Sequence, residues 1–217
     1  MDGVEAGGTI EAPGLRAHEI VLGVVMASMS GVAILAHTFG PVPMSFTVPF
    51  VVLPISFMFV GLVLARRHLY GRLHLFADRV LAGIGWACVA TCAYDAVRAV
   101  MRAVFRLSAD PFQAMPIFGH LITGLPKTDP LAITVGWIYH FWNGVSYAIM
   151  FALLWPRGGA LAGFIWAMIL QALMIADYPV LLQVRLDDPG WYAEGVVGHG
   201  VWGIVLGKGL SLRRDYG

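Results

Sequence analysis

The chain has 217 residues, of which 59% are hydrophobic and 12% are charged, and its mean hydropathy is +0.76. A soluble domain carries about 25% charged residues, so this composition excludes an ordinary soluble protein and predicts a chain that crosses the lipid bilayer several times. The formal net charge of +1 provides no basic domain, which excludes nucleic acid as a partner.

The first 17 residues are rich in Gly, and their charged residues are Asp2, Glu5, Glu11 and Arg16. They lack the basic start of a secretory signal, so we expect a short flexible tail that is retained. The apolar runs that follow are too long for barrel strands. They predict an all-α transmembrane bundle over residues 18–210, with a short C-terminal tail at 211–217.

A span needs about 20 predominantly apolar residues, and this length divides the bundle into six predicted transmembrane helices. They cover residues 18–39, 49–65, 80–101, 131–155, 160–182 and 195–210. Lys and Arg side chains are more frequent in cytoplasmic segments, and placing the N-terminus inside puts nine of them inside and five outside. We therefore expect both termini in the cytoplasm. The basic stripe of Arg98, Arg102 and Arg106 falls outside, where we expect it to reach lipid headgroups.

Residues 108–130, between the third and fourth predicted spans, are apolar in the middle but too short and too broken to cross. The breaks are Pro111, Pro116, Gly119, Gly124, Pro126 and Pro130. Such backbone is tolerated at membrane depth only against protein or a cavity, so we expect a re-entrant or interfacial segment over one end of the bundle. Cys88 and Cys92 lie four residues apart in the third span, which favours two small core residues; a redox pair or soft-metal ligands are the alternative.

Polar side chains inside the spans fall at one depth, the outer half of the bundle. They are Asp95, His140, Asp177 and His199, and His37, His120 and Glu194 lie on the same side. A single buried His often only joins helices by hydrogen bonds, and Asp95 could pair with Arg98 or Arg102 in its own helix. Asp177 has no cationic partner within its helix, so we expect it beside His140 or His199. A buried aspartate is costly and indicates function.

Two predicted helices place their polar residues on faces that also carry glycines. Gly136, His140, Asn143, Gly144 and Tyr147 share one face of the fourth span, and Gly195, His199, Gly203 and Gly207 share one face of the sixth. Glycines at spacing four let helices approach closely in lipid. The two faces therefore predict an outer-leaflet polar pocket assembled from several helices.

Imidazoles and carboxylates together are the ligands that zinc and iron favour. The predicted metal ligands are His140, His199, His120 and Asp177, and the predicted catalytic residues are Asp95, Asp177, His120 and Asn143. The sequence has no H-E-x-x-H, H-x-x-x-H, CxxC, G-x-S-x-G or phosphate-loop motif, so such a site would have to come from separate helices.

Three functional classes fit these features. The first is a membrane-embedded enzyme, with or without a divalent metal, that acts on a lipid-like or hydrophobic substrate entering from the outer leaflet. The second is a small proton- or cation-coupled transporter that uses the same side chains. The third is a structural or assembly subunit of a membrane complex. The clustering at one depth and the lack of a duplicated half favour the enzyme.

The segments ATCAYDAVR, PIFGHLITG, GWIYHFWNG and GHGVWGIVLG lie between residues 90 and 207. Their combination resembles multi-pass bacterial integral membrane proteins of uncharacterised function. The resemblance implies a bacterial inner-membrane location and brings no activity with it. Membrane zinc hydrolases of the alkaline ceramidase type share the general character of the polar groups, but the missing H-x-x-x-H counts against membership.

Overall fold

The protein is described by a computed structural model over residues 14–107, 110–182 and 188–212. Most of each predicted tail lies outside these residues. Within them every regular element is helical, which confirms the all-α class. The elements are α1 (Ala17–Thr38), α2 (Met44–Thr47), a π-helical turn (Val48–Val52), α3 (Leu53–Ala65), a 3₁₀ turn (Arg66–His68), α4 (Gly71–Phe105), α5 (Ala114–Thr123), α6 (Pro130–Leu154), α7 (Gly159–Leu182) and α8 (Pro189–Ser211).

Four helical segments are long and apolar enough to cross a membrane: Ala17–Thr38, Met44–His68, Gly71–Phe105 and Gly159–Leu182. By helix length and hydropathy the chain is therefore a multi-pass membrane protein. The other two predicted spans correspond to α6, with 25 residues, and α8, with 23, which are long enough but less apolar. His, Asn, Trp and Tyr side chains lower the hydropathy of α6, and Gly, His and Glu lower that of α8. Membrane crossing by α6 and α8 stays a prediction.

Aspartate caps and prolines fix where α6 and α8 begin. The carboxylate of Asp129 accepts a hydrogen bond from the backbone N–H of Leu131, and Pro130 takes the first helical position. The carboxylate of Asp188 accepts in the same way from Gly190 and Trp191, ahead of a proline at 189. Both arrangements satisfy helix N–H groups that have no partner within the helix, and both are readable from sequence.

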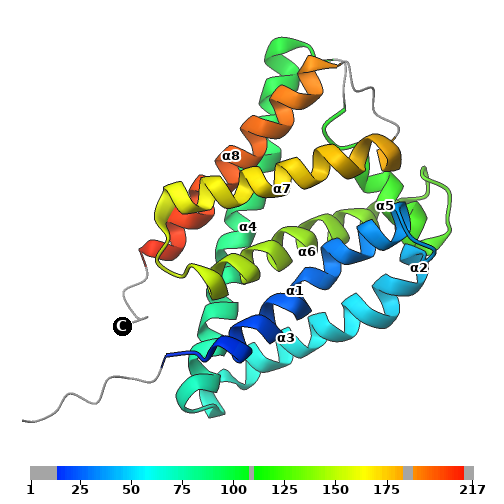
Figure 1. The fold of residues 1–217 in the computed structure, drawn as a ribbon. Helices are drawn as coiled ribbons and strands as arrows, with labels where there is room; N and C mark the ends of the chain where they lie inside the picture. Colours follow the sequence, from blue (N-terminus) through cyan, green and yellow to red (C-terminus); the bar gives the residue numbers. More distant parts are fainter. Residues whose placement is uncertain (1–13, 108–109, 183–187, 213–217) are drawn as a thin grey trace, which may run out of the picture.

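Helix α6 is the centre of the bundle and packs against α1, α4 and α5, whereas α8 packs against α4 and α7. Figure 1 shows the start of α1, the α3–α4 and α6–α7 connections and the end of α8 toward one end of the molecule, with the α1–α2 connection and α5 at the other. This alternation agrees with the predicted order of the helices and puts the start of α1 and the end of α8 on one side. Whether that side is the cytoplasm stays a prediction.

The described part of the segment 108–130 forms a short helix, α5, on the end of the bundle. Gly119 of α5 contacts the backbone of Ala132, and Gly136 of α6 contacts the backbone of Met115, so the two helices touch along their main chains. Phe118 and Met115 of α5 are fully buried. The predicted packing of this segment against protein is confirmed, and its return to the side it left stays a prediction.

Cys88 and Cys92 are free and exposed on α4. The interpretation of them as core residues is wrong. Spacing four correctly placed both on one face of the helix, but α4 uses its other side to pack on α6 and α8, as the buried Ala87, Ala90 and Thr91 show. In a membrane the face with the cysteines meets lipid.

Candidate functional site

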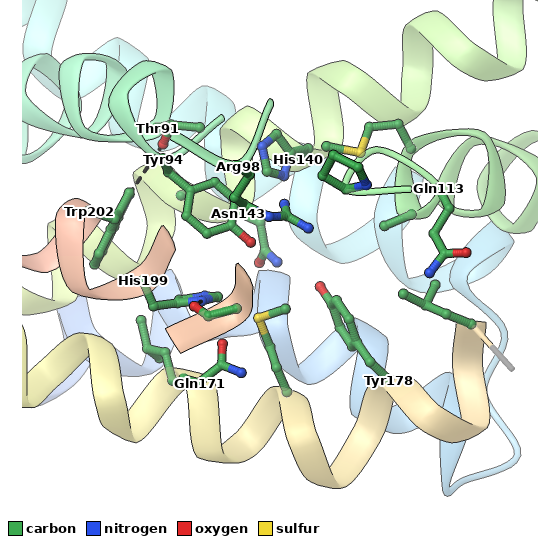
Figure 2. Close-up of a pocket in the computed structure, with 18 of the residues that line it drawn as sticks. Thr91, Tyr94, Arg98, Gln113, His140, Asn143, Gln171, Tyr178, His199 and Trp202 are labelled. Atoms are coloured by element: carbon green, nitrogen blue, oxygen red, sulfur yellow. Dashed lines mark hydrogen bonds between the residues drawn. The ribbon is translucent and has the colours of Figure 1, made fainter. Parts of the chain in front are cut away.

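A cavity of about 80 Å³ lies among α4, α5, α6, α7 and α8. Figure 2 shows polar side chains from four of these helices pointing into it. They include Thr91, Tyr94 and Arg98 of α4, His140, Asn143 and Tyr147 of α6, Gln171 and Tyr178 of α7, and His199 and Trp202 of α8. One water needs roughly 10–15 Å³ of such space. The cavity therefore has room for several waters or for a small polar group of a ligand.

His140 and Asp95 form the pair that joins α4 to α6 beside this cavity. The His140 Nε2 lies 3.1 and 3.2 Å from the two carboxylate oxygens of Asp95. Because a carboxylate only accepts hydrogen bonds, Nε2 is the nitrogen that carries the proton. The rings of Tyr94, Trp137 and Phe141 pack around the imidazole at centroid distances of 5.7–6.0 Å and hold its orientation.

Arg98 forms its ion pair with a residue of another helix, so of the two alternatives for Asp95 the structure shows the position beside the pocket, paired with His140, and not the pair with Arg98. Its Nε lies 2.7 Å from Oε1 of Glu194, whose side chain is 1% exposed. Its guanidinium also stacks on the ring of Tyr94, at 4.6 Å from the centroid. Arg102 pairs instead with Asp110, at 2.7 Å. Spacing along one helix did not identify these partners, because both arginines form their ion pairs with residues outside α4.

His199 faces His140 across the cavity, with Tyr94 between them. The Nδ1 of His199 lies 3.0 Å from the backbone carbonyl of Gly195, and its ring contacts Tyr94 edge to face at 5.0 Å. A carbonyl oxygen only accepts, so Nδ1 donates and Nε2 keeps its lone pair. His199 can therefore accept a hydrogen bond from a ligand through Nε2.

Asn143 is held between α6 and α1. Its Oδ1 accepts a hydrogen bond of 2.9 Å from the Ser30 hydroxyl, and both residues are buried. Tyr139, one turn earlier on α6, donates a 2.6 Å bond to the carbonyl of Ser30. These contacts fix the amide of Asn143 at the boundary between the first cavity and a second one.

A second cavity of about 60 Å³ adjoins the first, and Asp177 belongs to it. Both cavities are lined by Asn143, Tyr147, Leu170, Met174, Tyr178 and His199, so they share a wall. Asp177 is 3% exposed, and in the described part of the chain its Oδ1 has no hydrogen-bond partner. Its polar neighbours are His37 and Thr38 of α1. The expected neighbour His199 thus lines the same cavity as Asp177, whereas His140 lines only the first.

His120 is placed away from these groups. It is not among the residues that line either cavity, and its Nδ1 lies 2.7 Å from the carbonyl of Leu125 in its own loop. Among the described residues no three His, Cys, Asp or Glu side chains form a group that could hold a metal ion. The predicted ligand set of His140, His199, His120 and Asp177 is therefore not gathered at one point. A bound zinc or iron stays a prediction.

Sequence reasoning missed several residues of the site, notably Tyr94, Gln171 and the pairing of Arg98 with Glu194. Gln171 carried a usable signal, because it is the one amide side chain of a strongly apolar predicted span. Tyr94 carried no such signal, since a tyrosine in an apolar helix is common at packing positions.

No protein-family profile, curated protein or solved structure matches the chain.

Proposed function

We propose that the protein is a membrane-embedded enzyme in which His140, oriented by Asp95, is the general acid–base group. One observation supports this most directly: an imidazole on the cavity wall is bridged through Nε2 to both oxygens of a partly buried carboxylate, at 3.1 and 3.2 Å. A carboxylate in this position fixes the tautomer of a histidine and its orientation.

The proposed chemistry follows from that tautomer. With its proton on Nε2, neutral His140 has a lone pair on Nδ1 that can take a proton from water or from a hydroxyl group of a substrate. Asp95 then stabilises the imidazolium that forms, and the same proton can return to a leaving group. Proton transfer by a positioned side chain contributes roughly 10²–10⁴-fold to a rate.

The walls of the cavity suggest a substrate with both polar and apolar parts. Besides the polar side chains, the first cavity is lined by Met115, Phe118, Leu170, Met174 and Leu182. An amphiphile could place its chain against these side chains and its polar group beside His140. We therefore propose a lipid-like substrate that enters from the membrane.

The proposal is tested in proteoliposomes made from a bacterial polar lipid extract. Mass spectrometry should show one lipid class decreasing and a product appearing with wild-type protein. His140→Gln should slow this conversion by about 10² or more, because the general base is lost. Asp95→Asn should slow it less, and Cys88→Ser, on the lipid-facing side of α4, should leave it unchanged.

Conversion at the wild-type rate by His140→Gln would refute the acid–base role. Unchanged lipids, together with cation uptake that depends on Asp177, would instead support the transporter hypothesis. Metal analysis of the same preparations tests the metal prediction. Wild-type protein should carry zinc or iron at close to one equivalent. The metal should be lost in His140→Ala and His199→Ala and kept in His18→Ala and His68→Ala.

A further inference from the structure

Several buried oxygen atoms around the two cavities have no hydrogen-bond partner among the described residues, and each of these atoms belongs to a carboxylate or an amide carbonyl, which accepts hydrogen bonds. In the described residues these atoms are Oδ1 of Asp177, Oε1 of Gln171 and Oε2 of Glu194. Asp177 and Gln171, each 3% exposed, line the cavities directly, and Glu194 lies behind Arg98. An unpartnered buried polar group is costly, and a buried charge more so. The missing partner of these atoms is therefore a hydrogen-bond donor.

The charge of Asp177 is not compensated by a Lys or Arg side chain of its cavity. The described residues that line this cavity include neither type; His37 on α1 is a titratable neighbour of Asp177, and His199 on α8 lines the same cavity. The amide oxygen of Asn143 is already occupied by Ser30, and Tyr147 and Tyr178 contribute uncharged phenols. A ligand at this position would meet one carboxylate and two aromatic rings.

The first cavity cannot supply the missing positive charge. Among its described lining residues Arg98 is the one Lys or Arg, and that guanidinium is held by Glu194 at 2.7 Å and stacked on Tyr94 at 4.6 Å. The remaining pair, Asp95 with His140, is at most neutral. With Asp177 ionised and His37 neutral, the two adjoining cavities together carry an excess of negative charge, and they attract cations.

From these observations we propose that the second cavity is a subsite for a primary ammonium group, which the buried carboxylate of Asp177 binds. A primary ammonium donates three hydrogen bonds and accepts none, which suits the unpartnered Oδ1 of Asp177 in this cavity. Tyr147 and Tyr178 also line this cavity, and an aromatic ring that turns its face to the ammonium adds cation–π attraction. The inference rests on the proposed enzyme and narrows its substrate to amphiphiles with an amine near the group that meets His140.

The test uses the full chain in phosphatidylcholine nanodiscs. Ethylammonium chloride is the probe for a free amine, and phosphatidylethanolamine is the probe for a lipid headgroup. Trp191 and Trp202 line the first cavity and report ethylammonium binding through fluorescence, whereas native mass spectrometry reports retained phosphatidylethanolamine. Retention of the lipid would identify a headgroup as the source of the amine. Binding of ethylammonium without retention would identify a free amine.

In either case Asp177→Asn should weaken binding about tenfold or more, because a charge-assisted hydrogen bond is lost. Asp129→Asn is the matched control: it makes the same chemical change at the start of α6, where asparagine also caps a helix, and it should bind like wild type. Circular dichroism checks folding, and Asp177→Leu gives a second variant without the carboxylate.

Three results would overturn the subsite. The first is that wild-type protein binds neither amine, and the second is that both Asp177 variants bind the amines as tightly as wild type does. The third is that wild type binds tetramethylammonium or sodium, which cannot donate hydrogen bonds, as tightly as it binds ethylammonium. The result of this binding test does not depend on the result of the lipid-conversion test for the proposed enzyme. His140→Gln should bind ethylammonium normally while losing lipid conversion, so a failure of one idea leaves the other measurable.

Discussion

The ion pair between Arg98 and Glu194 is the most enclosed charge pair that the structure describes between two helices. Its side chains are 12% and 1% exposed, and it connects the C-terminal part of α4 to the start of α8 beside the cavity. Such a pair adds little net stability, because burying its two charges carries a large desolvation penalty. Removing one member leaves the other as an unpaired buried charge, which destabilises the protein. Its position fits a role in placing Tyr94, because the guanidinium that Glu194 holds stacks on that ring.

We expect Glu194→Gln to destabilise the protein by about 3–5 kcal/mol, because Arg98 keeps its charge without a carboxylate partner. Unfolding in detergent micelles, followed by circular dichroism, measures this change. The double variant Arg98→Met with Glu194→Leu should recover most of the loss, since it removes both charges together. An unfolding midpoint of Glu194→Gln equal to that of wild type would contradict this reading of the pair.

Main-chain contact between helices explains how α7 and α8 come so close. Gly163 of α7 and Gly203 of α8 each face the other's backbone carbonyl, and Gly207 faces that of Gly159. The sequence predicted the close approach from the spacing of Gly203 and Gly207 but could not name the partner helix. A larger side chain at any of these glycines would push α7 and α8 apart and open the cavity wall that carries His199.

Gly203→Ala should therefore destabilise the bundle by about 1–3 kcal/mol through overpacking. Gly85→Ala is the matched control, because the added carbon on this exposed face of α4 would meet nothing within 4 Å. It should be neutral or stabilising by up to about 1 kcal/mol, as expected for alanine replacing glycine within a helix. Thermal unfolding of the two variants in the same detergent compares them. A Gly203→Ala variant as stable as Gly85→Ala would show that the helices can separate without cost.

The positions of the helices could be predicted from the sequence, whereas the side-chain contacts between helices could not, and the difference has a physical reason. Lipid requires long apolar helices, so their positions can be read from hydropathy, and caps such as Asp129 mark where they begin. Helix α4 was predicted too short, because Arg72, Asp78 and Arg79 interrupt the apolar run although they form ion pairs and hydrogen bonds at the helix surface. The partner of Asp95 depends on which face of α4 meets α6, which spacing along one helix does not determine.

At the level of the whole molecule, the helix order implies that positions 72 and 188 lie on opposite sides of the membrane. Arg72 follows the α3–α4 connection, at the end of the molecule where α1 starts, and Asp188 precedes α8. Single cysteines at these positions, in a Cys88→Ser, Cys92→Ser background, should react with a membrane-impermeant maleimide from opposite sides. The positive-inside bias predicts that position 188 is labelled from outside. Labelling of both from the same side would refute the topology.

The length of α4 ties the site to the thickness of the surrounding membrane. A straight helix of 35 residues is about 50 Å long at 1.5 Å per residue, whereas the hydrocarbon core is about 30 Å thick. The helix must tilt or extend into the headgroup layer, and its last turns carry Arg98 and Arg102 next to the cavity. Longer lipid chains would draw these residues toward hydrocarbon, and shorter ones would leave them among phosphates. Acyl-chain length is therefore a physical control on access to the cavity, separate from any chemistry inside it.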